Sequence, residues 1–343
     1  MELTTTNQKH DLMILSQLGQ AANQAAADST FSEYANRKAA NSIRRHKAGL
    51  ALFSDFLQSR GAAVGDLATD PAAWNGITWG LVKAFQNWMI LEGYAVSTAN
   101  QRLSTVKVYA KLAMKAGTLA AGDYALIKAL EGYQRREAIE LDCKREDNGI
   151  STRRGHKKAA WISISKEQAR ALKNQPNTPQ GRRDRLMFCL LLDHGLRCGE
   201  VAGLQVSDFD LKTGELHFYR PKVHKTQTHR MSKDTAAAAA AYLENDALAI
   251  GPLLRGSNKA GVLGAAGLSE QAITARVRHL GAAMGIETLS AHDCRHYWAT
   301  QAARNKTPLD RLQDAGGWAS TAMPMRYIET AKIANEGVIL GAD

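Results

Sequence analysis

Six polar residues spread over the second half of the chain are of the types that can cleave a phosphodiester. They are Arg197 in LLDHGLRCGEVAGL, Lys222 in FYRPKVHKT, His292 and Arg295 in LSAHDCRHYWAT, Trp318 in DAGGWAS and Tyr327 in MRYIE. Together they supply three cations, a proton acceptor, an indole hydrogen-bond donor and a phenol. A protein with this inventory can attack a phosphate through tyrosine without a metal ion.

Tyr327 is the candidate nucleophile of this set. A phenol has a pKa of about 10 and is almost wholly protonated near pH 7, so it needs a base. His292 is the best available base, and cations around the phosphate favour the phenolate. The alternative for a tyrosine in a short amphipathic helix is half-buried packing, and the residue taken alone does not decide between the two.

Arg197 and Arg295 are the candidate phosphate ligands. Arg197 follows a long apolar helix and precedes Glu200, which is a costly place for a cation unless an anion pairs with it. That anion is either Glu200, in a structural ion pair, or a phosphate, with Glu200 orienting the catalytic groups. His292 and Arg295 lie three apart near the start of a helix and therefore share one face. Two arginines could grip one phosphate and stabilise the charge of its pentacoordinate state.

Two lysines and a tryptophan complete the candidate site. Strands are expected over 214–220 and 226–232, with Lys222 and Lys225 in the turn between them. We favour Lys222 as the functional lysine because it directly follows the first strand, although Lys225 could fill the same role and either could be an ordinary basic hairpin tip. Trp318 is expected to pack and to donate to the phosphate, because indole cannot accept or relay a proton.

The length of 343 residues predicts two domains. The residue patterns predict a mainly helical fold with a small antiparallel sheet. Residues 1–28 are polar and alanine-rich and are expected to form a mobile arm or a weak helix. A helical domain is expected over 29–140, with helices near 35–60, 78–92, 97–116 and 122–138. The polar stretch 141–160 holds two glycines and is the expected linker.

The second domain is expected over 161–328, followed by an apolar tail over 329–343. Its predicted helices lie near 165–173, 181–195, 233–246, 269–284, 291–305, 308–316, 320–328 and 331–340. The tail carries Ile333, Val338, Ile339 and Leu340, so it needs a groove to cover it, either on its own domain or on a neighbouring subunit.

The charge of the chain favours a polyanionic partner. Its formal net charge is +11 with a pI near 9.5, which is typical of nucleic-acid-binding proteins but weak evidence alone. The candidate DNA contacts cluster on two helices, in the linker and in the hairpin turn: Arg44, Arg45, Lys107, Lys111, Lys115, Arg153, Arg154, Lys157, Lys158 and Lys225. The alternatives are a solvated helix face and a plain flexible hinge.

The order and spacing of these residues resemble the tyrosine recombinase (phage integrase) family, and the resemblance covers most of the chain. It rests on LxxGLRxxE, then HxxR, then GGW with Tyr327 nine residues after Trp318. Many members carry histidine where this chain has Trp318. The resemblance implies a SAM-like core-binding domain and a catalytic domain that together form a C-shaped clamp on DNA.

The resemblance also implies the reaction and the assembly. Tyr327 would attack a phosphate of duplex DNA to give a 3′-phosphotyrosine, and Lys222 would protonate the leaving 5′ oxygen. Exchange through a Holliday junction would need neither ATP nor metal. The expected partners are a DNA site with inverted repeats and three further copies of the chain, which form a tetramer by exchange of the C-terminal tail.

Two other functions share parts of this pattern: a type IB topoisomerase, which acts as a monomer on one duplex, and a DNA-binding protein with an inactive site. The four cysteines form no CxxC pair and do not have the spacing of metal ligands. We therefore expect reduced thiols, and we expect no metal or other cofactor. No apolar run approaches the length of a membrane span, and the N-terminus lacks a secretory pattern. We expect a cytoplasmic protein that is encoded by a prokaryote, a phage or a mobile element.

Overall fold

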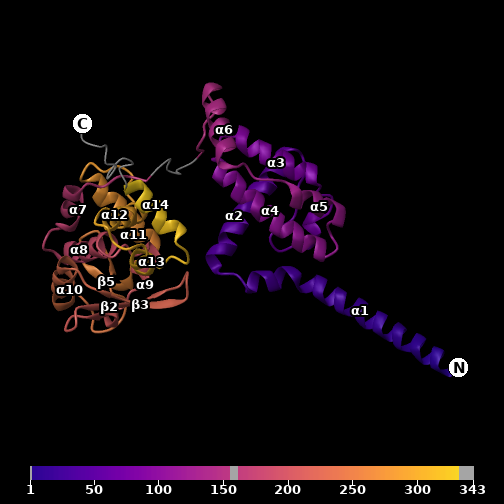
Figure 1. The fold of residues 1–343 in the computed structure, drawn as a ribbon, viewed down its shortest axis with the longest axis horizontal. Coiled ribbons are helices and arrows are strands. Elements are labelled where there is room, and N and C mark those ends of the chain that lie inside the picture. Colours follow the sequence, from indigo (N-terminus) through magenta and orange to yellow (C-terminus); the bar gives the residue numbers. More distant parts are fainter. Residues whose placement is uncertain (1, 155–160, 332–343) are drawn as a thin grey trace, which may run out of the picture. The chain divides into compact units, whose positions relative to one another are not determined.

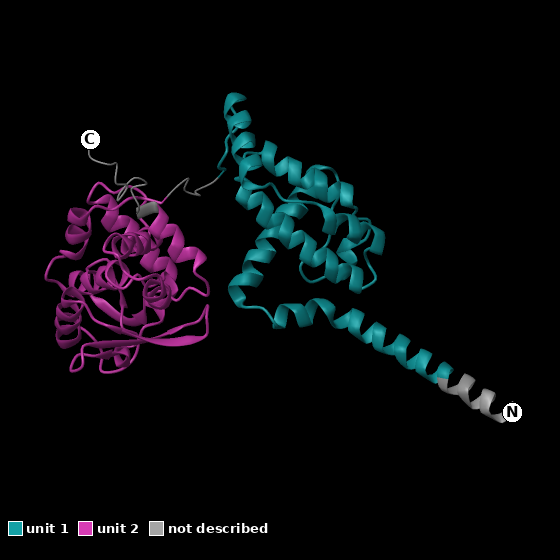
Figure 2. Cartoon of the chain, in the orientation of Figure 1, with its two compact units in different colours: residues 1–159 teal, residues 160–343 magenta. Residues whose placement is uncertain are grey.

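The computed structural model describes residues 2–154 and 161–331, with backbone only for 2–11 and 330–331. The chain divides into two compact units, residues 1–159 and 160–343 (Figures 1 and 2). Most elements are helices and the sheets are small, so the predicted fold class is confirmed. In the described part, no helix is both long and apolar enough to cross a membrane.

Unit 1 is built of helices joined by short loops. Its elements are α1 (Glu2–Asn36), α2 (Ala40–Ser59), the 3-10 helix η1 (Pro71–Trp74), α3 (Trp79–Leu91), α4 (Val96–Lys115), α5 (Ala121–Ala129) and α6 (Arg135–Asp147). Aromatic side chains fill the space between them, with Phe53 packed against Phe85 and Trp74. The periodicity of the sequence therefore predicts α3 and α4 well, because each turns one apolar face to this core.

Residues 2–36 form one unbroken helix where the sequence predicts a mobile arm or a weak helix over 1–28 (Figure 1). Alanine, which has the highest helix propensity, is frequent in this segment. The C-terminal part of α1 is also fixed by tertiary contacts, since Phe31 and Tyr34 both contact the ring of Tyr109 on α4. Composition alone did not show this anchor.

The helix predicted over 122–138 is two helices, α5 and α6, and the prediction of one helix is wrong. Side chains from α4 hold the break between them. Asn100 donates to the carbonyl of Tyr133 and accepts from its amide, and Lys107 donates to the carbonyls of Lys128 and Leu130. These contacts join residues more than 20 positions apart, so no local pattern indicates them.

The region predicted as a linker, 141–160, belongs partly to unit 1. Helix α6 continues to Asp147, and the buried guanidinium of Arg145 donates to the carbonyls of Ile90, Tyr94 and Thr152. Further along, the Arg154 amide donates to the Gly93 carbonyl at 2.6 Å. Hydrogen bonds therefore hold part of this polar segment against α3 and the loop that follows it. Lys157 and Lys158 lie outside the described residues.

Unit 2 combines helices with two small antiparallel sheets. Its elements are α7 (Lys166–Lys173), α8 (Pro179–Leu192), α9 (Cys198–Gly203), the 3-10 helix η2 (Val206–Asp208), β1 (Phe209–Asp210), β2 (Glu215–Arg220), β3 (Lys225–Arg230), α10 (Lys233–Asn245), β4 (Arg255–Ser257), β5 (Leu263–Gly267), α11 (Glu270–Ala282), α12 (Ala291–Arg304), α13 (Leu309–Gly316) and α14 (Ala322–Ala331). One sheet has the order β1-β2-β3, and β4 pairs with β5 in the other.

Helix α8 lies at the centre of unit 2. Its residues 186–192 are each at most 2% exposed, so this half of the helix is apolar on all sides, as expected of a helical segment enclosed by others. It packs against α7, α10 and α12. The loop that follows α8 carries Arg197 and is therefore anchored in the core. Of the predicted tail, residues 332–343 lie outside the described residues.

Candidate active site

Arg197 ends the loop after α8 and begins α9, and Glu200 lies one turn into that helix. The Glu200 carboxylate accepts from the backbone amide of Arg197 at 2.8 Å and from its guanidinium at 2.7 Å. The first bond satisfies an amide at the start of α9 that has no partner within the helix. The structural ion pair that the sequence allows is therefore present, and a quarter of the Arg197 side chain is still exposed.

Glu200 also binds a second arginine, Arg220, at the end of β2. Both oxygens of Glu200 accept from Nη1 of Arg220, at 3.0 and 2.9 Å, and the Arg220 side chain is fully buried. Its Nε donates to Gln227 on β3. Burial lowers the pKa of the Arg220 guanidinium, and the charge of Glu200 opposes this shift. Glu200 thus joins α9 to the sheet.

Three arginines donate to consecutive carbonyl groups at the C-terminal end of α13. Arg220 binds the carbonyl of Ala315 at 2.7 Å, Arg295 binds that of Gly316 at 2.5 Å, and Arg197 binds that of Gly317 at 3.1 Å. Carbonyl groups at a helix C-terminus carry partial negative charge, which favours cations. We call Arg197, Arg220, Arg295 and Glu200 the arginine cluster.

The two glycines of the GGW motif are required by this geometry. Gly317 has φ 57°, in the left-handed region that ends many helices, and a Cβ there would lie 2.6 Å from the Arg220 side chain. A Cβ on Gly316 would lie 2.1 Å from the Trp318 ring. Side chains at these positions would therefore displace both an arginine and the tryptophan.

The arginine cluster holds more positive than negative charge. In the described part of the chain, Glu200 is the carboxylate that forms ion pairs with Arg197 and Arg220, and Arg295 donates to backbone carbonyls. Arg295 is 3% exposed, and its remaining partner is the carbonyl of Gly195 at 2.5 Å. Burial, and next the charge of Arg197, lower the pKa of Arg295 to about 9. A site with this imbalance is suited to an anionic ligand.

Trp318 and Tyr327 lie next to the cluster. The guanidinium of Arg295 lies 4.7 Å from the centre of the Trp318 ring, which in turn lies 5.6 Å from that of Tyr327. Tyr327, on α14, is 4% exposed. Burial raises the pKa of its phenol, while the charges of Arg295 and Arg197 oppose the shift. The predicted nucleophile is therefore close to cations that would favour its phenolate.

His292 is exposed at the start of α12, one helical turn before a second histidine, His296. Their Nε2 atoms lie 3.1 Å apart, within hydrogen-bonding distance. The ring of His296 contacts Tyr327, with ring centres 5.1 Å apart. The structure thus places a histidine pair beside the phenol where the sequence analysis assigned one base.

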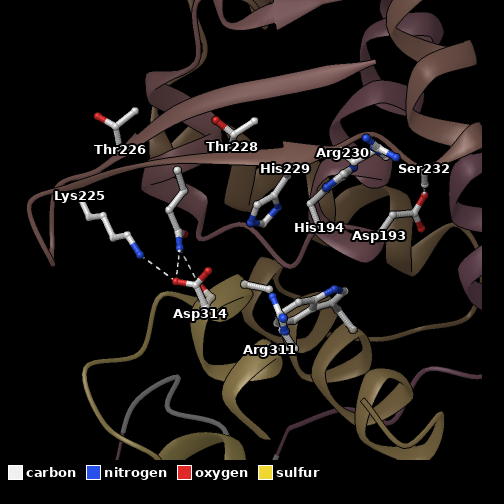
Figure 3. A pocket seen from close by; sticks show the side chains of 13 residues that line it. Asp193, His194, Lys225, Thr226, Thr228, His229, Arg230, Ser232, Arg311 and Asp314 are labelled. Atoms are coloured by element: carbon white, nitrogen blue, oxygen red, sulfur yellow. Dashed lines mark hydrogen bonds and ion pairs between the residues drawn. The ribbon is translucent and has the colours of Figure 1, made fainter. Parts of the chain in front are cut away.

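The two candidate lysines differ in their contacts. Lys222 is exposed in the turn between β2 and β3. Lys225, the first residue of β3, forms an ion pair with Asp314 on α13 at 2.7 Å (Figure 3). Gln227 donates to Asp314 as well, and the Lys225 hydrogen bond is the main cause that lowers the pKa of Asp314. Lys225 therefore links the hairpin to α13, whereas Lys222 extends into solvent.

A groove of about 600 Å³ lies between β3 and the α13 region (Figure 3). His194 and His229 both line it. Burial lowers the pKa of His194 to about 4 and that of His229 to about 3, so both are neutral near pH 7. In the described residues, no group of three or more His, Cys, Asp or Glu side chains could hold a metal ion.

The DNA-contact candidates of unit 1 are not equivalent. Lys111 and Lys115 share a groove of about 560 Å³ with two basic residues of the α1–α2 loop, Arg37 and Lys38. Lys107 instead donates to two carbonyls at the end of α5, and burial lowers its pKa.

The remaining candidates of unit 1 also have different surroundings. Arg44 and Arg45 are exposed on α2. Arg153 is partly buried near the end of the described part of unit 1. Arg154 forms an ion pair with Glu92 and lies over the Tyr94 ring. Two of these four cations thus have the open surroundings that a DNA phosphate needs.

Arg220 and His296 were not among the residues predicted from the sequence. Leu216, Phe218 and Arg220 alternate along β2 and are buried, so an arginine on the inward face indicated a buried partner. His296 follows His292 by four residues, which places both on one helical face. Both signals were in the printed sequence.

Known proteins of one family are similar to this chain. The model of the phage integrase family matches residues 163–333. Tyrosine recombinase XerC of Mycobacterium bovis is 27% identical over 310 residues, 88% of this chain and 93% of that protein. A putative integrase/recombinase, y4rF, of Sinorhizobium fredii is 27% identical over 157 residues, which span 45% of this chain but 37% of that relative.

Solved structures show the same fold. The Tn1549 transposon integrase in complex with transposon right-end DNA has a TM-score of 0.60, is 13% identical, and is matched over 96% of its length and 91% of this chain. A lambda integrase dimer bound to a COC′ core site has a TM-score of 0.57, with 14% identity over 94% of this chain and 83% of that one. The chain belongs to the phage integrase family of tyrosine recombinases.

Proposed function

We propose that this tyrosine recombinase is a site-specific enzyme that breaks and rejoins duplex DNA through a phosphotyrosine bond on Tyr327. The observation that carries the proposal is the arginine cluster beside a buried tyrosine. Arg197 and Arg220 share the Glu200 carboxylate, and Arg295 donates to backbone carbonyls, so a DNA phosphate would supply the missing negative charge. A structural cluster would be expected to balance its charges, because an uncompensated buried charge destabilises a fold.

In the cleavage step, the phenol oxygen of Tyr327 attacks a phosphorus atom and the bond from phosphorus to the 5′ oxygen breaks. His292 accepts the phenol proton, and Lys222 donates a proton to the leaving 5′ oxygen. Arg197 and Arg295 bind the non-bridging oxygens, Glu200 orients them, and Trp318 donates its indole N–H. Each guanidinium has five N–H donors, so the bonds to carbonyl groups leave others for the phosphate.

The products are a 3′-phosphotyrosine and a free 5′ hydroxyl. That hydroxyl attacks the phosphotyrosine of a partner duplex, which rejoins the strands and gives a Holliday junction. The number and type of phosphoester bonds are conserved, so no ATP or metal is consumed. The names of the related proteins, XerC recombinase and Tn1549 integrase, support recombination over relaxation of a single duplex.

We further propose that both units contact the DNA and form a clamp around it. The contacts of unit 1 come from Arg44, Arg45, Lys111 and Lys115, and those near the linker from Arg153, Arg154, Lys157 and Lys158. Lys107 would hold the end of α5 in place on the DNA-binding face. Lys225 would contact the DNA backbone from the β2–β3 hairpin. Two solved relatives described as complexes with DNA support this role.

Assembly as a homotetramer on two sites with inverted repeats, with the tails of residues 329–343 exchanged between subunits, is the arrangement we propose for strand exchange. Exchange of strands between two duplexes needs four active tyrosines, one for each strand. The bacterial relatives support a role on prokaryotic or mobile-element DNA in the cytoplasm.

Covalent capture tests the function and finds the site. Protein is incubated with sheared DNA of its source genome, and adducts that survive denaturation are isolated and sequenced. We expect adducts at defined sites with the wild type, none with Tyr327→Phe, and normal amounts with Tyr219→Phe, which alters an exposed tyrosine of β2. Adducts that persist in Tyr327→Phe would refute the proposed nucleophile, and a wild type without adducts would refute the function.

A further inference from the structure

His296 contacts three other aromatic rings in unit 2. It lies one helical turn after His292 on α12, and the Nε2 atoms of the two imidazoles are 3.1 Å apart. Its ring meets that of Tyr327 on α14 at 65°. On another side it stacks on Trp161, with ring centres 5.3 Å apart and planes within 8°. His296 therefore links the proposed base, the proposed nucleophile and the start of unit 2.

The contact between the two histidines constrains how His292 can act as a base. When two neutral imidazoles share one hydrogen bond, one ring nitrogen must donate and the other must accept. If Nε2 of His292 donates, its Nδ1 is the basic nitrogen, and the same bond remains when His292 becomes charged. A general base oriented by a third group is the usual arrangement around an activated nucleophile.

The surroundings of His296 keep it neutral and able to accept. Burial lowers its pKa to about 4, and the neighbouring charge of His292 adds to the effect. The titratable and charged groups around it are His292, Asp293 and Arg295 on α12 and Tyr327 on α14. His296 is therefore suited to accept a hydrogen bond rather than to carry a proton itself.

Trp161 fixes the other face of the His296 ring. The next residue, Ile162, donates its amide to Asp293 at 2.9 Å, and Asp293 also accepts from the amide of Ser290 at the start of α12. The chain that enters unit 2 is therefore bonded to the helix that carries both histidines. Trp161 is 41% exposed, so its inner face stacks on His296 while part of the ring meets solvent.

We propose that His296 is a positioning residue that accepts a hydrogen bond from Nε2 of His292, and that Trp161 holds it in place. The role rests on the proposed function, because it matters for catalysis only if His292 receives the proton of Tyr327. The hydrogen bond itself is a property of the DNA-free protein. It can therefore be tested without any reaction.

The first test measures the tautomer of His292 by nitrogen-15 NMR in the DNA-free protein. We expect the Nε2–H form to dominate in the wild type and a mixture of tautomers in His296→Phe, which keeps a ring against Trp161 but removes both nitrogens. His279→Phe, on the exposed last turn of α11, is the matched control and should change nothing. A His292 tautomer that is mixed in the wild type, or unchanged in His296→Phe, would overturn the proposal.

The second test measures single-turnover cleavage of a nicked suicide substrate from about pH 5.5 to about pH 9, around the ordinary histidine pKa. We expect His296→Phe to be about tenfold slower at its optimum, with a displaced acid limb, at unchanged DNA affinity. His296→Gln keeps an acceptor and should cleave within about threefold of the wild type. Trp161→Ala should fall between these two variants.

The comparison of the two His296 variants decides the role. Equal rates for His296→Phe and His296→Gln, whether both normal or both slow, would show that the hydrogen bond has no part in cleavage. If His296→Phe does not fold, His296→Met replaces it in the pair. A wild type that shows the expected tautomer but cleaves no DNA would refute the proposed function and leave the hydrogen bond standing.

Discussion

The arginine cluster and the β2–β3 turn supply the cations of one proposed site in opposite ways. In the cluster, Arg220 and Arg295 are buried, and protein carbonyls or Glu200 already accept from them. In the turn, Lys222 is exposed, and the nearby Lys225 pairs with an Asp314 carboxylate that is itself exposed. The first region is fixed by folding, and the second is free to follow a ligand.

Because of this difference, a mutation in the cluster should affect both stability and cleavage, whereas a mutation in the turn should affect cleavage alone. A buried charge that loses its partner costs stability as well as function, because water cannot replace the partner. An exposed lysine contributes little to folding, so its loss should be seen in the reaction alone. The predictions below therefore distinguish a loss of cleavage rate from a loss of stability.

The largest effect is expected in the turn. Lys222→Ala should slow cleavage of the suicide substrate by about 10²–10⁴-fold, the usual contribution of a general acid, without changing the melting temperature. A substrate with sulfur in place of the leaving 5′ oxygen should restore most of the rate, because a thiolate leaves without a proton (thiol pKa about 8.5). Lys212→Ala, in the exposed turn before β2, is the matched control.

Lys225→Ala sharpens the same comparison. We expect less than a tenfold loss of cleavage and only partial rescue by the sulfur substrate, because this lysine links β3 to Asp314. Full rescue of Lys225→Ala, together with no rescue of Lys222→Ala, would reverse the assignment of the general acid.

Glu200→Gln should have the largest effect on stability. The change removes the carboxylate shared by Arg197 and Arg220, and the loss of one partner of a buried ion pair costs about 3–5 kcal/mol. Urea denaturation followed by circular dichroism measures this loss. Glu287→Gln, at an exposed position, serves as the control and should be neutral. Equal stability of the two variants would mean that the cluster does not depend on its carboxylate.

Gly317→Ala should reduce stability less than Glu200→Gln does. The left-handed backbone at Gly317 strains any residue with a Cβ by about 1–3 kcal/mol, and the new methyl group would lie against Arg220. We expect a lower melting temperature and slower cleavage, measured in parallel. Gly214→Ala also has a positive φ but open space around it, so it should show the strain without the loss of cleavage. Similar cleavage by both variants would contradict the role of the close contact.

The sequence predicted the parts of the fold that local periodicity determines. Helices α3 and α4 each have an apolar face that repeats at helical spacing, and the alternation of buried residues along β2 indicates a strand. The break between α5 and α6 was not predictable, because Asn100 and Lys107 on α4 hold it from a distance. Local patterns do not report contacts between distant segments.

The same limit applies to the candidate site. The order of Arg197, Arg295 and Tyr327 indicated a phosphate site, and the structure brings these three residues together around Trp318. The order of residues in the sequence did not indicate that a second arginine binds Glu200, or that His292 pairs with His296. These partners depend on how β2 and α12 pack, which a residue pattern does not specify.

The contact between Arg220 and Gly317 also has a consequence for how the gene can change over time. A side chain at 317 would occupy the space of the Arg220 guanidinium, and without Arg220 the carbonyl of Ala315 would lose its donor. Positions 220 and 317 lie 97 residues apart in the printed sequence, yet neither can drift freely while the other is kept. Among descendants of this gene, the two codons should therefore be replaced together or not at all.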